Sequence, residues 1–323
     1  MRLAAILLVA CAVLGVQAQL FKGTNGLPKD LRIMMTNSAG WYDYSIRFWF
    51  NTLLDRGYDV VLSAPAKDMT MNYQSKVGYG GRDEEPWTRL TPCQWHSCEP
   101  GQRWGSNETS FGRLNWVNSY PATALRFGLD RFGRFKWDHK LPDLVIAGPT
   151  DGPNIGAEVS FSGVVAQAAL AANKYRIPAI TFAWPGLGIM KWDPDRPIPP
   201  RMKTYLDLAQ NLTELVVAGG RPFLPENTFL NVNFPPLGAP CNGTRAIQYV
   251  LTRRDLDDQG YHVYFDHCNT RRLPTDRELY QHLGCYASIS VLSATHSKTA
   301  GASVLKIMRD RLSPLLTCVN WGP

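Results

Sequence analysis

The sequence has few of the motifs that would assign it quickly to a function class. It contains no G-x-S-x-G motif, no G-x-x-x-x-G-K-[ST] phosphate loop and no C-x-x-C pair. A hydrolase with a nucleophile elbow, a P-loop protein and a zinc site with C-x-x-C spacing are therefore not indicated. It also contains no run of five or six like charges, so its net charge of +7 is scattered. Scattered charge predicts a solvated basic surface and gives no signal for a nucleic-acid partner.

The chain also lacks a long apolar run beyond its N-terminus. Residues 1–18 predict a signal peptide, because Arg2 precedes an almost purely apolar stretch that ends near Val16, and Ala18 is a small residue before the expected cleavage point. That stretch is short for a membrane helix, which needs about 20 residues, although an uncleaved anchor is the alternative. We expect residues 19–323 to be secreted and extracellular, with no membrane span.

Cysteine and N-x-[ST] patterns agree with secretion. Seven cysteines are present, and one lies within the expected signal peptide. The even number that remains predicts three disulfides in an oxidising compartment, with fifteen possible pairings. The six cysteines are Cys93, Cys98, Cys241, Cys268, Cys285 and Cys318, of which the first two are close enough to close one loop. Three glycosylation sequons, at Asn107, Asn211 and Asn242, are expected on surface loops.

Apolar periodicity predicts an α/β fold. Short apolar strands at 32–36 and 58–62 flank a helix whose apolar side chains recur at i, i+3, i+4, i+7 and i+8 from Ile46. A second unit has a strand at 144–147, a helix that Ser162 opens and a strand at 177–182. Two such β-α-β units predict a parallel sheet with helices on its faces.

Residues 19–323 are expected to form one domain. Its core covers 31–200 and carries an irregular, disulfide-bearing insertion at 66–115, and a C-terminal extension covers 201–323. In the extension we expect a short polar helix at 203–217, antiparallel strands that form an arm or edge, and a last helix. The expected strands follow the segment 230–235 and are 247–252, 262–265 and 289–292. The last helix carries Val304, Ile307, Met308 and Leu312 as its apolar residues.

Five short segments, in order along the chain, resemble motifs of the SurE family of metal-dependent phosphatases and nucleotidases. They are M-T-N-S-A-G at 35–40 (T-N-D-D-G in the family), A-P at 64–65, A-G-P-T-D-G-P-N-I-G at 147–156 (S-G-x-N-x-G-x-N-x-G), S-G-V-V at 162–165 (S-G-T-V) and L-N-V-N-F-P at 230–235 (N-V-N-x-P). The insertion, L-N-W-V-N-S-Y-P at 114–121 and V-L-S-A at 291–294 look like the secreted fungal branch.

The resemblance implies a Rossmann-like three-layer core with an antiparallel arm, often in a homodimer. It implies hydrolysis of phosphomonoesters such as nucleoside monophosphates, with Mg²⁺ or Mn²⁺ held where the strand ends converge. Those hard cations prefer oxygen ligands, and one or two carboxylates supply most of their binding.

The chain departs from the family at the metal. The paired aspartates of T-N-D-D-G correspond to Ser38 and Ala39, the serine after A-P corresponds to Thr70, and the asparagine of the glycine-rich loop corresponds to Thr150. These neutral side chains cannot replace two carboxylates, and without a metal no activated water forms near neutral pH. We therefore expect no metal cofactor and a catalytically degenerate member that binds an anionic ligand or a partner.

Two alternatives remain open. Asp43 and Asp151 could restore a metal site, giving an active acid phosphatase or 5'-nucleotidase with rearranged ligands, or the cleft could serve a metal-free enzyme of another class. In the degenerate reading, Asn37 or Ser38 caps the first helix, Ser162 caps the second, and their free N–H groups hold phosphate or a nucleotide. The expected anion-binding residues are Asn37, Gly40, Gly148, Asn154, Ser162 and Gly163.

Overall fold

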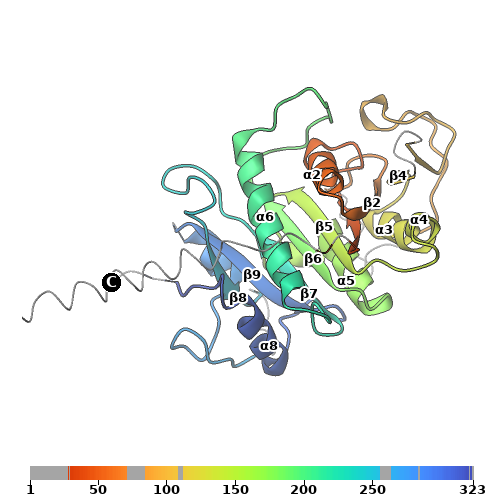
Figure 1. Ribbon diagram of the computed structural model, residues 1–323. Helices are drawn as coiled ribbons and strands as arrows, with labels where there is room; N and C mark the ends of the chain where they lie inside the picture. Colours follow the sequence, from red (N-terminus) through yellow and green to blue (C-terminus); the bar gives the residue numbers. More distant parts are fainter. Residues whose placement is uncertain are drawn as a thin grey trace, which may run out of the picture.

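A single mixed sheet forms the centre of the structure (Figure 1). The computed structural model describes residues 28, 30–70, 84–107, 112–254, 263–282, 284–319 and 321. Within these residues nine strands pair in the order β3-β4-β2-β1-β5-β6-β7-β9-β8. They are β1 (Arg32–Thr36), β2 (Asp59–Pro65), β3 (Trp104–Ser106), β4 (Leu114–Val117), β5 (Leu144–Asp151), β6 (Ala179–Trp184), β7 (Thr228–Asn233), β8 (Gln248–Thr252) and β9 (Tyr286–Ser293).

Helices connect and cover these strands. The α-helices are α2 (Tyr44–Asp55), α3 (Pro121–Phe127), α4 (Gly133–Lys136), α5 (Gly163–Lys174), α6 (Pro200–Ala218), α7 (Asp276–Gln281) and α8 (Ala302–Leu312). A π-helical turn η4 (Gly128–Phe132) joins α3 to α4, and the short 3₁₀ helices are η2 (Gln94–His96) and η5 (Glu158–Ser160). Both predicted β-α-β units are confirmed, since β1 pairs parallel with β2 and β5 pairs parallel with β6.

Alternation along β1 explains the layers of the domain. Ile33 and Met35 belong to one hydrophobic cluster, and Met34 belongs to the other. The first cluster contains the apolar faces of α2, α6 and α8, and the second contains those of α3 and α5. In Figure 1, α6 crosses in front of the sheet. Successive side chains of a strand point to opposite faces, so a sheet buried on both faces reads as the continuous apolar runs seen in the sequence.

The strand order reverses between β1 and β5. From β1 the chain moves outward to β2 and β4, and then returns to β5 on the other side of β1 before continuing to β6 and β7. In open parallel sheets such a reversal leaves a crevice at the carboxyl ends of the two strands, which is where ligands bind.

The C-terminal part extends the main sheet. β9 pairs antiparallel with β7, as expected. The antiparallel pairing expected for 247–252 is wrong, since β8 pairs parallel with β9 at the edge, and the connection that contains α7 is long enough for this crossover. The strand expected at 262–265 is wrong for its described part, since residues 263–266 form no strand, and His262 lies outside the described residues. The helix expected at 203–217 is confirmed as α6 and is longer than expected. Ten of its side chains are buried, so it is less polar in its setting than the sequence suggested. The buried face of α8 is Leu305, Met308 and Leu312, whereas Ile307 is 50% exposed.

The insertion is more ordered at its C-terminal end than expected. Residues 71–83 and 108–111 lie outside the described residues. β4 pairs parallel with β2 and belongs to the core sheet, and β3 adds an antiparallel strand beside it. Polar Asn115 interrupts the apolar pattern of β4, because its side-chain amide donates to the Leu62 carbonyl of β2.

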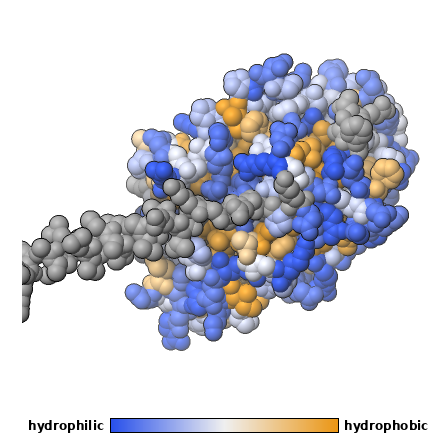
Figure 2. All heavy atoms as spheres, in the orientation of Figure 1, coloured by the Kyte–Doolittle hydropathy of each residue, from blue (hydrophilic) through white to orange (hydrophobic). Residues whose placement is uncertain are grey.

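Three disulfides form, as predicted, and the structure pairs Cys93 with Cys98, Cys241 with Cys285 and Cys268 with Cys318. Two of the glycosylation sequons lie in different structures. Asn242 is exposed in a loop, as expected, whereas Asn211 is exposed on helix α6 and not on a loop. No described helix is long and apolar enough to cross a membrane, and residues 1–18 are outside the described part. Hydrophobic residues on the face in Figure 2 form small separate patches among hydrophilic ones.

Candidate active site

Two buried hydroxyls meet at the strand-order reversal. Ser38 follows β1, Thr150 lies near the end of β5, and their Oγ and Oγ1 atoms are 3.4 Å apart. Ser38 is 2% exposed and Thr150 is 7% exposed. Either hydroxyl can donate to the other. The chain therefore places two of the four metal-equivalent positions side by side, at the crevice where the topology predicts a ligand.

A bulge in β5 directs Thr150 toward this crevice. β5 and β6 are in register at Ala147 with Thr181, and then at Thr150 with Ala183, so β5 carries one extra residue. Gly148 lies in the bulge with φ +126°, and a Cβ there would lie 2.5 Å from the Phe182 carbonyl oxygen. Glycine is required at this position, because a side chain would meet both backbone strain and a steric clash. Gly148 thus shapes the bulge with its backbone.

The loop after β1 is closed by its own side chains. The Asn37 amide donates to the Gly40 carbonyl at 3.3 Å, and the Gly40 N–H donates back to Asn37 Oδ1 at 3.1 Å. Gln167 of α5 donates to Thr36 Oγ1 at 2.6 Å and to the Asn37 carbonyl at 3.0 Å. The Gly40 N–H, expected to contact an anion, is therefore used within the loop.

Asp43 caps α2, so the expectation that Asn37 or Ser38 does so is wrong. The Asp43 carboxylate accepts from the Ser45 N–H at 3.1 Å and from the Ser45 hydroxyl, and its other oxygen accepts from the Met190 N–H at 3.1 Å. The helix begins at Tyr44, after a loop that the Trp41 N–H fixes to the Pro65 carbonyl. Burial raises the pKa of Asp43 to about 6, despite these hydrogen bonds, which lower it.

The N-terminus of α5 lies against Ser38. Ser162 caps this helix, as predicted, by accepting the Val165 N–H at 3.3 Å. A Cβ at Gly163 would lie 3.0 Å from Ser38 Cβ, which shows how closely the first turn approaches. A helix N-terminus carries partial positive charge and free N–H groups, so this approach favours negative charge near Ser38.

The segment after β2 contacts the same loop through its backbone and carries a carboxylate beside that contact. The Met69 N–H donates to the Ser38 carbonyl at 2.8 Å. The neighbouring Asp68 accepts from the Thr70 N–H at 2.8 Å and from the Thr70 hydroxyl at 2.6 Å, both through Oδ1. Thr70, the third metal-equivalent position, is therefore used to hold Asp68. Sequence reasoning missed Asp68, although an Asp two residues before a Thr is a common pattern of a local turn.

Asp151 holds a neighbouring loop. Its two carboxylate oxygens accept from the backbone N–H groups of three consecutive loop residues, Gly186 at 2.8 Å, Leu187 at 3.4 Å and Gly188 at 3.1 Å. The side chain is exposed. Both carboxylates considered as replacement ligands, Asp43 and Asp151, thus already accept hydrogen bonds through both of their oxygens.

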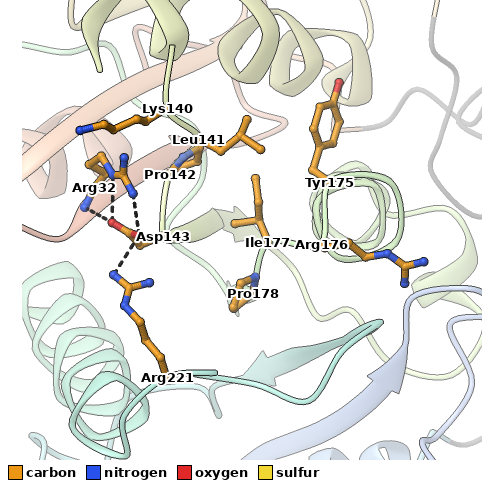
Figure 3. Close-up of a pocket in the computed structure, with 10 residues that line it drawn as sticks. All are labelled: Arg32, Lys140, Leu141, Pro142, Asp143, Tyr175, Arg176, Ile177, Pro178 and Arg221. Carbon is orange, nitrogen blue, oxygen red and sulfur yellow. Dashed lines mark hydrogen bonds and ion pairs between the residues drawn. The ribbon is translucent and has the colours of Figure 1, made fainter. Parts of the chain in front are cut away.

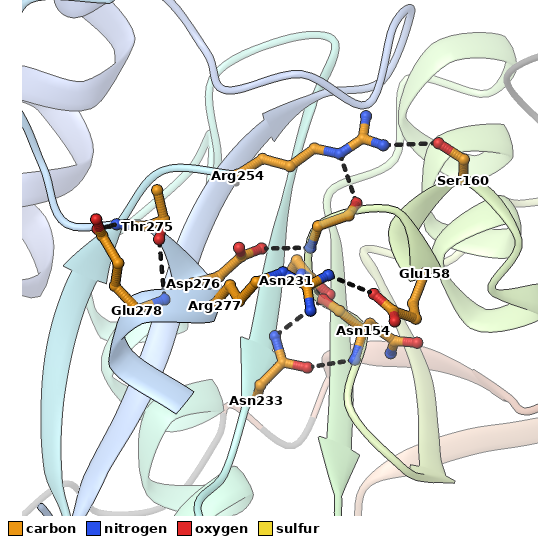
Figure 4. Close-up of polar contacts among 11 residues, drawn as sticks. Asn154, Glu158, Ser160, Asn231, Asn233, Arg254, Thr275, Asp276, Arg277 and Glu278 are labelled. Carbon is orange, nitrogen blue, oxygen red and sulfur yellow. Dashed lines mark hydrogen bonds and ion pairs between the residues drawn. The ribbon is translucent and has the colours of Figure 1, made fainter. Parts of the chain in front are cut away.

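A polar network fixes the rest of the 147–156 loop (Figure 4). The Asn154 N–H donates to Asn233 Oδ1 at 2.6 Å, and Asn231 donates to the Asn154 carbonyl at 2.8 Å. The Gly156 N–H donates to Asp276 at 3.2 Å, and its carbonyl accepts from Arg254 at 2.9 Å. These anchors come from β7, from the start of α7 and from the end of β8.

Asn154 also carries an unused donor. Its Nδ2 is buried and makes no hydrogen bond to a described residue. Buried polar groups normally have a partner, so such a donor is a candidate for binding a ligand.

A buried arginine packs against aromatic rings, two of which follow the loop after β1. The Arg47 guanidinium of α2 lies 5.1–5.4 Å from the ring centres of Trp41, Tyr42 and Trp192. Burial lowers the pKa of Arg47 to about 10, so the group stays charged at neutral pH. The three rings stabilise that charge by cation–π attraction.

The donor set does not fit Mg²⁺ or Mn²⁺. The four metal-equivalent positions provide three hydroxyls and the methyl group of Ala39, which is 3% exposed. Within the described part of the chain, the group of three close Cys, His, Asp or Glu ligands is His267 with Cys268 and Cys318, and these two cysteines form a disulfide. A hard divalent cation needs carboxylates that the crevice residues expected to hold it do not supply.

Comparison with known proteins gives a consistent result. The sequence profile of the family described as "Survival protein SurE" matches residues 33–256. A 5'-nucleotidase SurE from Caldanaerobacter subterraneus subsp. tengcongensis is 28% identical over 213 residues, covering 66% of this chain and 69% of the relative. An acid phosphatase from Yarrowia lipolytica is 26% identical over 295 residues, covering 82% and 79%.

A solved structure confirms the fold. The crystal structure of the SurE protein from Aquifex aeolicus superimposes with a TM-score of 0.51 at 19% sequence identity, covering 86% of this chain and 98% of that one. At this identity the likeness shows the fold alone, which is the Rossmann-like α/β fold predicted from the sequence.

Proposed function

The chain belongs to the SurE family, and we propose that it is a secreted member of the fungal type that binds a phosphate-bearing anion without metal-dependent turnover. The observation that carries this proposal is the Ser38–Thr150 hydroxyl pair at the strand-order reversal. In the family resemblance these positions belong to an aspartate and an asparagine that hold the metal. Here they offer two neutral groups that can donate to an anion.

Several further donors support anion binding. The first turn of α5 packs against Ser38, and Asn154 has a buried amide without a partner among the described residues. Hydroxyls, amides and helix N–H groups bind phosphate oxygens without a metal.

The loss of turnover follows from charge. Phosphoryl transfer needs a cation to neutralise the developing charge, and hydrolysis needs a water of lowered pKa. Asp43 is committed to capping α2, and Asp151 is committed to the 186–188 loop. Recruiting either carboxylate to a metal would break hydrogen bonds that hold backbone in place.

One observation favours a second candidate, a metal-dependent acid phosphatase with rearranged ligands. Asp68 lies next to Met69, which binds the Ser38 carbonyl. Its Oδ1 accepts from Thr70, and its Oδ2 makes no hydrogen bond to a described residue. Asp68 is therefore the first carboxylate to test if the protein hydrolyses phosphomonoesters with Mn²⁺.

A metal-free binding experiment tests the proposal. Chelator-treated protein is titrated with inorganic phosphate and with AMP by calorimetry. Thr150→Val removes one hydroxyl and should weaken binding about tenfold, since a hydrogen bond to a charged group contributes roughly 1.5–3 kcal/mol. Thr204→Val is the matched control, because its hydroxyl donates to the Pro200 carbonyl within α6. Equal binding by wild type and Thr150→Val would contradict the assignment of the crevice.

Activity measurements separate the two candidates. We expect no Mn²⁺- or Mg²⁺-stimulated hydrolysis of a chromogenic phosphomonoester by the unmodified protein. Robust turnover that chelator abolishes, and that Asp68→Asn also abolishes, would establish the second candidate instead.

Restoring the family ligands provides the complementary test. The triple variant Ser38→Asp, Ala39→Asp, Thr150→Asn should gain Mn²⁺ binding. Two buried aspartates repel each other without a metal, so this variant should melt at a lower temperature in chelator than in Mn²⁺. The unmodified protein should melt at the same temperature in both. A homodimer is expected from the family resemblance, and sedimentation of the purified protein tests it.

A further inference from the structure

A basic cavity lies at the amino ends of the central strands, whereas the crevice lies at their carboxyl ends. Its volume is about 480 Å³, within the usual range of small-molecule sites. Its residues come from the starts of strands or just before them, since Arg32 begins β1, Asp143 precedes β5, and Ile177 and Pro178 precede β6. A second cavity of about 230 Å³ adjoins it and shares Asp143, Arg176, Ile177, Pro178 and Arg221.

One buried carboxylate is shared by two guanidinium groups in this cavity (Figure 3). Arg32 donates to Asp143 from Nε at 3.1 Å and from Nη2 at 2.9 Å, and Arg221 Nη2 lies 2.8 Å from Asp143 Oδ1. The Asp143 side chain is 7% exposed, whereas that of Arg221 is 59% exposed. Burial raises the pKa of Asp143, but the hydrogen bonds and charges of Arg32 and Arg221 outweigh this and hold it below its ordinary value.

The cavity therefore carries excess positive charge. Asp143 can compensate only one of its two guanidinium partners. Lys140 and Arg176 also line the cavity, and neither forms an ion pair with a described residue. In Figure 3, Lys140 extends on the side of Arg32, and Arg176 lies on the opposite wall. Two guanidinium groups thus contact the one carboxylate, and two further cationic residues line the same cavity.

Nearby acidic groups offset only part of this excess, because none besides Asp143 lines the cavity, although Glu226 lines the adjoining one and Asp130 accepts from Tyr175 at 2.8 Å. Asp59 lies near Arg32 but pairs with Arg113 at 2.6 Å. Asp30 also lies near Arg32, and neither carboxyl lines the cavity. The remaining wall includes Leu141, Ile177 and two prolines. The cavity is open to solvent, so attraction between its cations and an anion should weaken as the ionic strength rises.

We propose that this cavity is a second binding site, for a small soluble anion that carries more than one negative charge, of the phosphate or pyrophosphate class. Arg221 and Lys140 provide the exposed charges that meet the ligand, and Arg32 is held in place by its two hydrogen bonds to Asp143. Guanidinium groups suit this class because they bind two phosphate oxygens at once.

The cavity is distinct from the crevice that contains Ser38 and Thr150. Arg32 begins β1 and Ser38 lies two residues beyond its other end, so the two are separated by the length of the strand, roughly 13 Å for the four steps of about 3.3 Å between its five residues. A ligand of pyrophosphate size cannot span that distance. The two sites can therefore be removed separately by substitution.

Calorimetric titration with inorganic pyrophosphate tests the proposal on the metal-free protein. The double variant Lys140→Gln, Arg221→Gln should weaken one binding event at least tenfold, whereas Thr150→Val should leave that event unchanged. Lys306→Gln, an exposed charge of α8 that lines neither cavity, is the control and should bind like wild type. Acetate at matched ionic strength should not compete, because it carries a single charge.

Several results would overturn the site. They are the absence of pyrophosphate binding by wild type, binding by the double variant that equals wild type, and loss of all binding in Thr150→Val. If the double variant fails to fold, wild-type protein answers the question through chemical modification. Pyrophosphate should protect Lys140 from an amine-specific reagent while leaving Lys306 reactive, as measured by mass spectrometry. Equal modification of Lys140 with and without pyrophosphate would also refute the proposal.

Discussion

Replacing Asp43 by asparagine should change how the stability of the protein depends on pH. The side chain is 3% exposed, and burial raises its pKa to about 6 from an ordinary value of 3.8. Between these two values the folded protein binds a proton that the unfolded chain releases. Protonation therefore stabilises the fold at low pH, and this contribution is lost as the pH rises through about 6.

The size of the effect follows from the two pKa values. Integrating the linkage relation from pH 7 to pH 5 gives wild type about 1.3 kcal/mol of unfolding free energy that Asp43→Asn cannot gain. A constant difference adds to this, because asparagine has a single acceptor oxygen and cannot accept from both Ser45 and Met190. That lost hydrogen bond costs roughly 1–2 kcal/mol at every pH. Wild type should therefore exceed the variant by more at pH 5 than at pH 7.

Urea unfolding with the disulfides intact measures this difference. The free energy of unfolding is determined for wild type and Asp43→Asn at several pH values between 5 and 7. Groups that titrate equally in both proteins cancel in the comparison. Asp55→Asn is the matched control, because Asp55 is exposed at the other end of α2 and should leave the pH dependence unchanged.

Parallel curves for wild type and Asp43→Asn would refute the assignment of a buried, proton-binding cap. A second outcome would refute the assignment of Asp43 as only a helix cap. If Mn²⁺ stabilises wild type and this stabilisation disappears in Asp43→Asn, then Asp43 is a metal ligand and the degenerate-site proposal is wrong.

Three further predictions concern the scaffold. Denatured, unreduced protein should contain no free thiol, and replacing both Cys268 and Cys318 by serine should lower the unfolding free energy by about 2–4 kcal/mol, because their disulfide closes a long loop with a sequence separation of 50. Gly148→Ala should lower it by about 2–3 kcal/mol, since the new Cβ would meet the Phe182 carbonyl at an unfavourable φ, and thermal melting measures this. Asn242→Gln should remove the mass of one glycan from protein made through a secretory pathway, as a glycosidase digest resolves.

Much of the fold could be predicted because its core strands are buried on both faces. Continuous apolar runs at 32–36 and 144–147 mark β1 and most of β5, and the 3.6-residue periodicity from Ile46 marks α2. β4 is missed from the sequence because its first two residues fall in the segment 66–115, whose clustered Gly, Pro, Trp and Cys residues show little periodicity and predict irregular structure. Asn115 of β4 donates to the Leu62 carbonyl of the neighbouring strand β2 and to the Gly112 carbonyl, and the first of these contacts cannot be seen in the sequence alone.

The site could be predicted in part. The order of the motifs and the topology indicated that Ser38 and Thr150 would converge, and they are in contact. The positions of Asp43 and Asp68 depend on loop conformation, which has no periodic signal. The cations of the basic cavity are far apart in the sequence, and they share only a place at the starts of neighbouring strands. Finding such a cavity requires the strand order.

The extra residue in β5 determines to which face of the sheet the later side chains of that strand point. Side chains alternate between the two faces of a sheet, and a bulge of one residue reverses the alternation beyond it. Thr150 lies beyond the bulge, so the face that it presents depends on an odd insertion at Gly148 and Pro149. Deleting one residue there would turn Thr150 to the opposite face of the sheet and separate it from Ser38. The site therefore depends on the number of residues within β5 as well as on which residues they are.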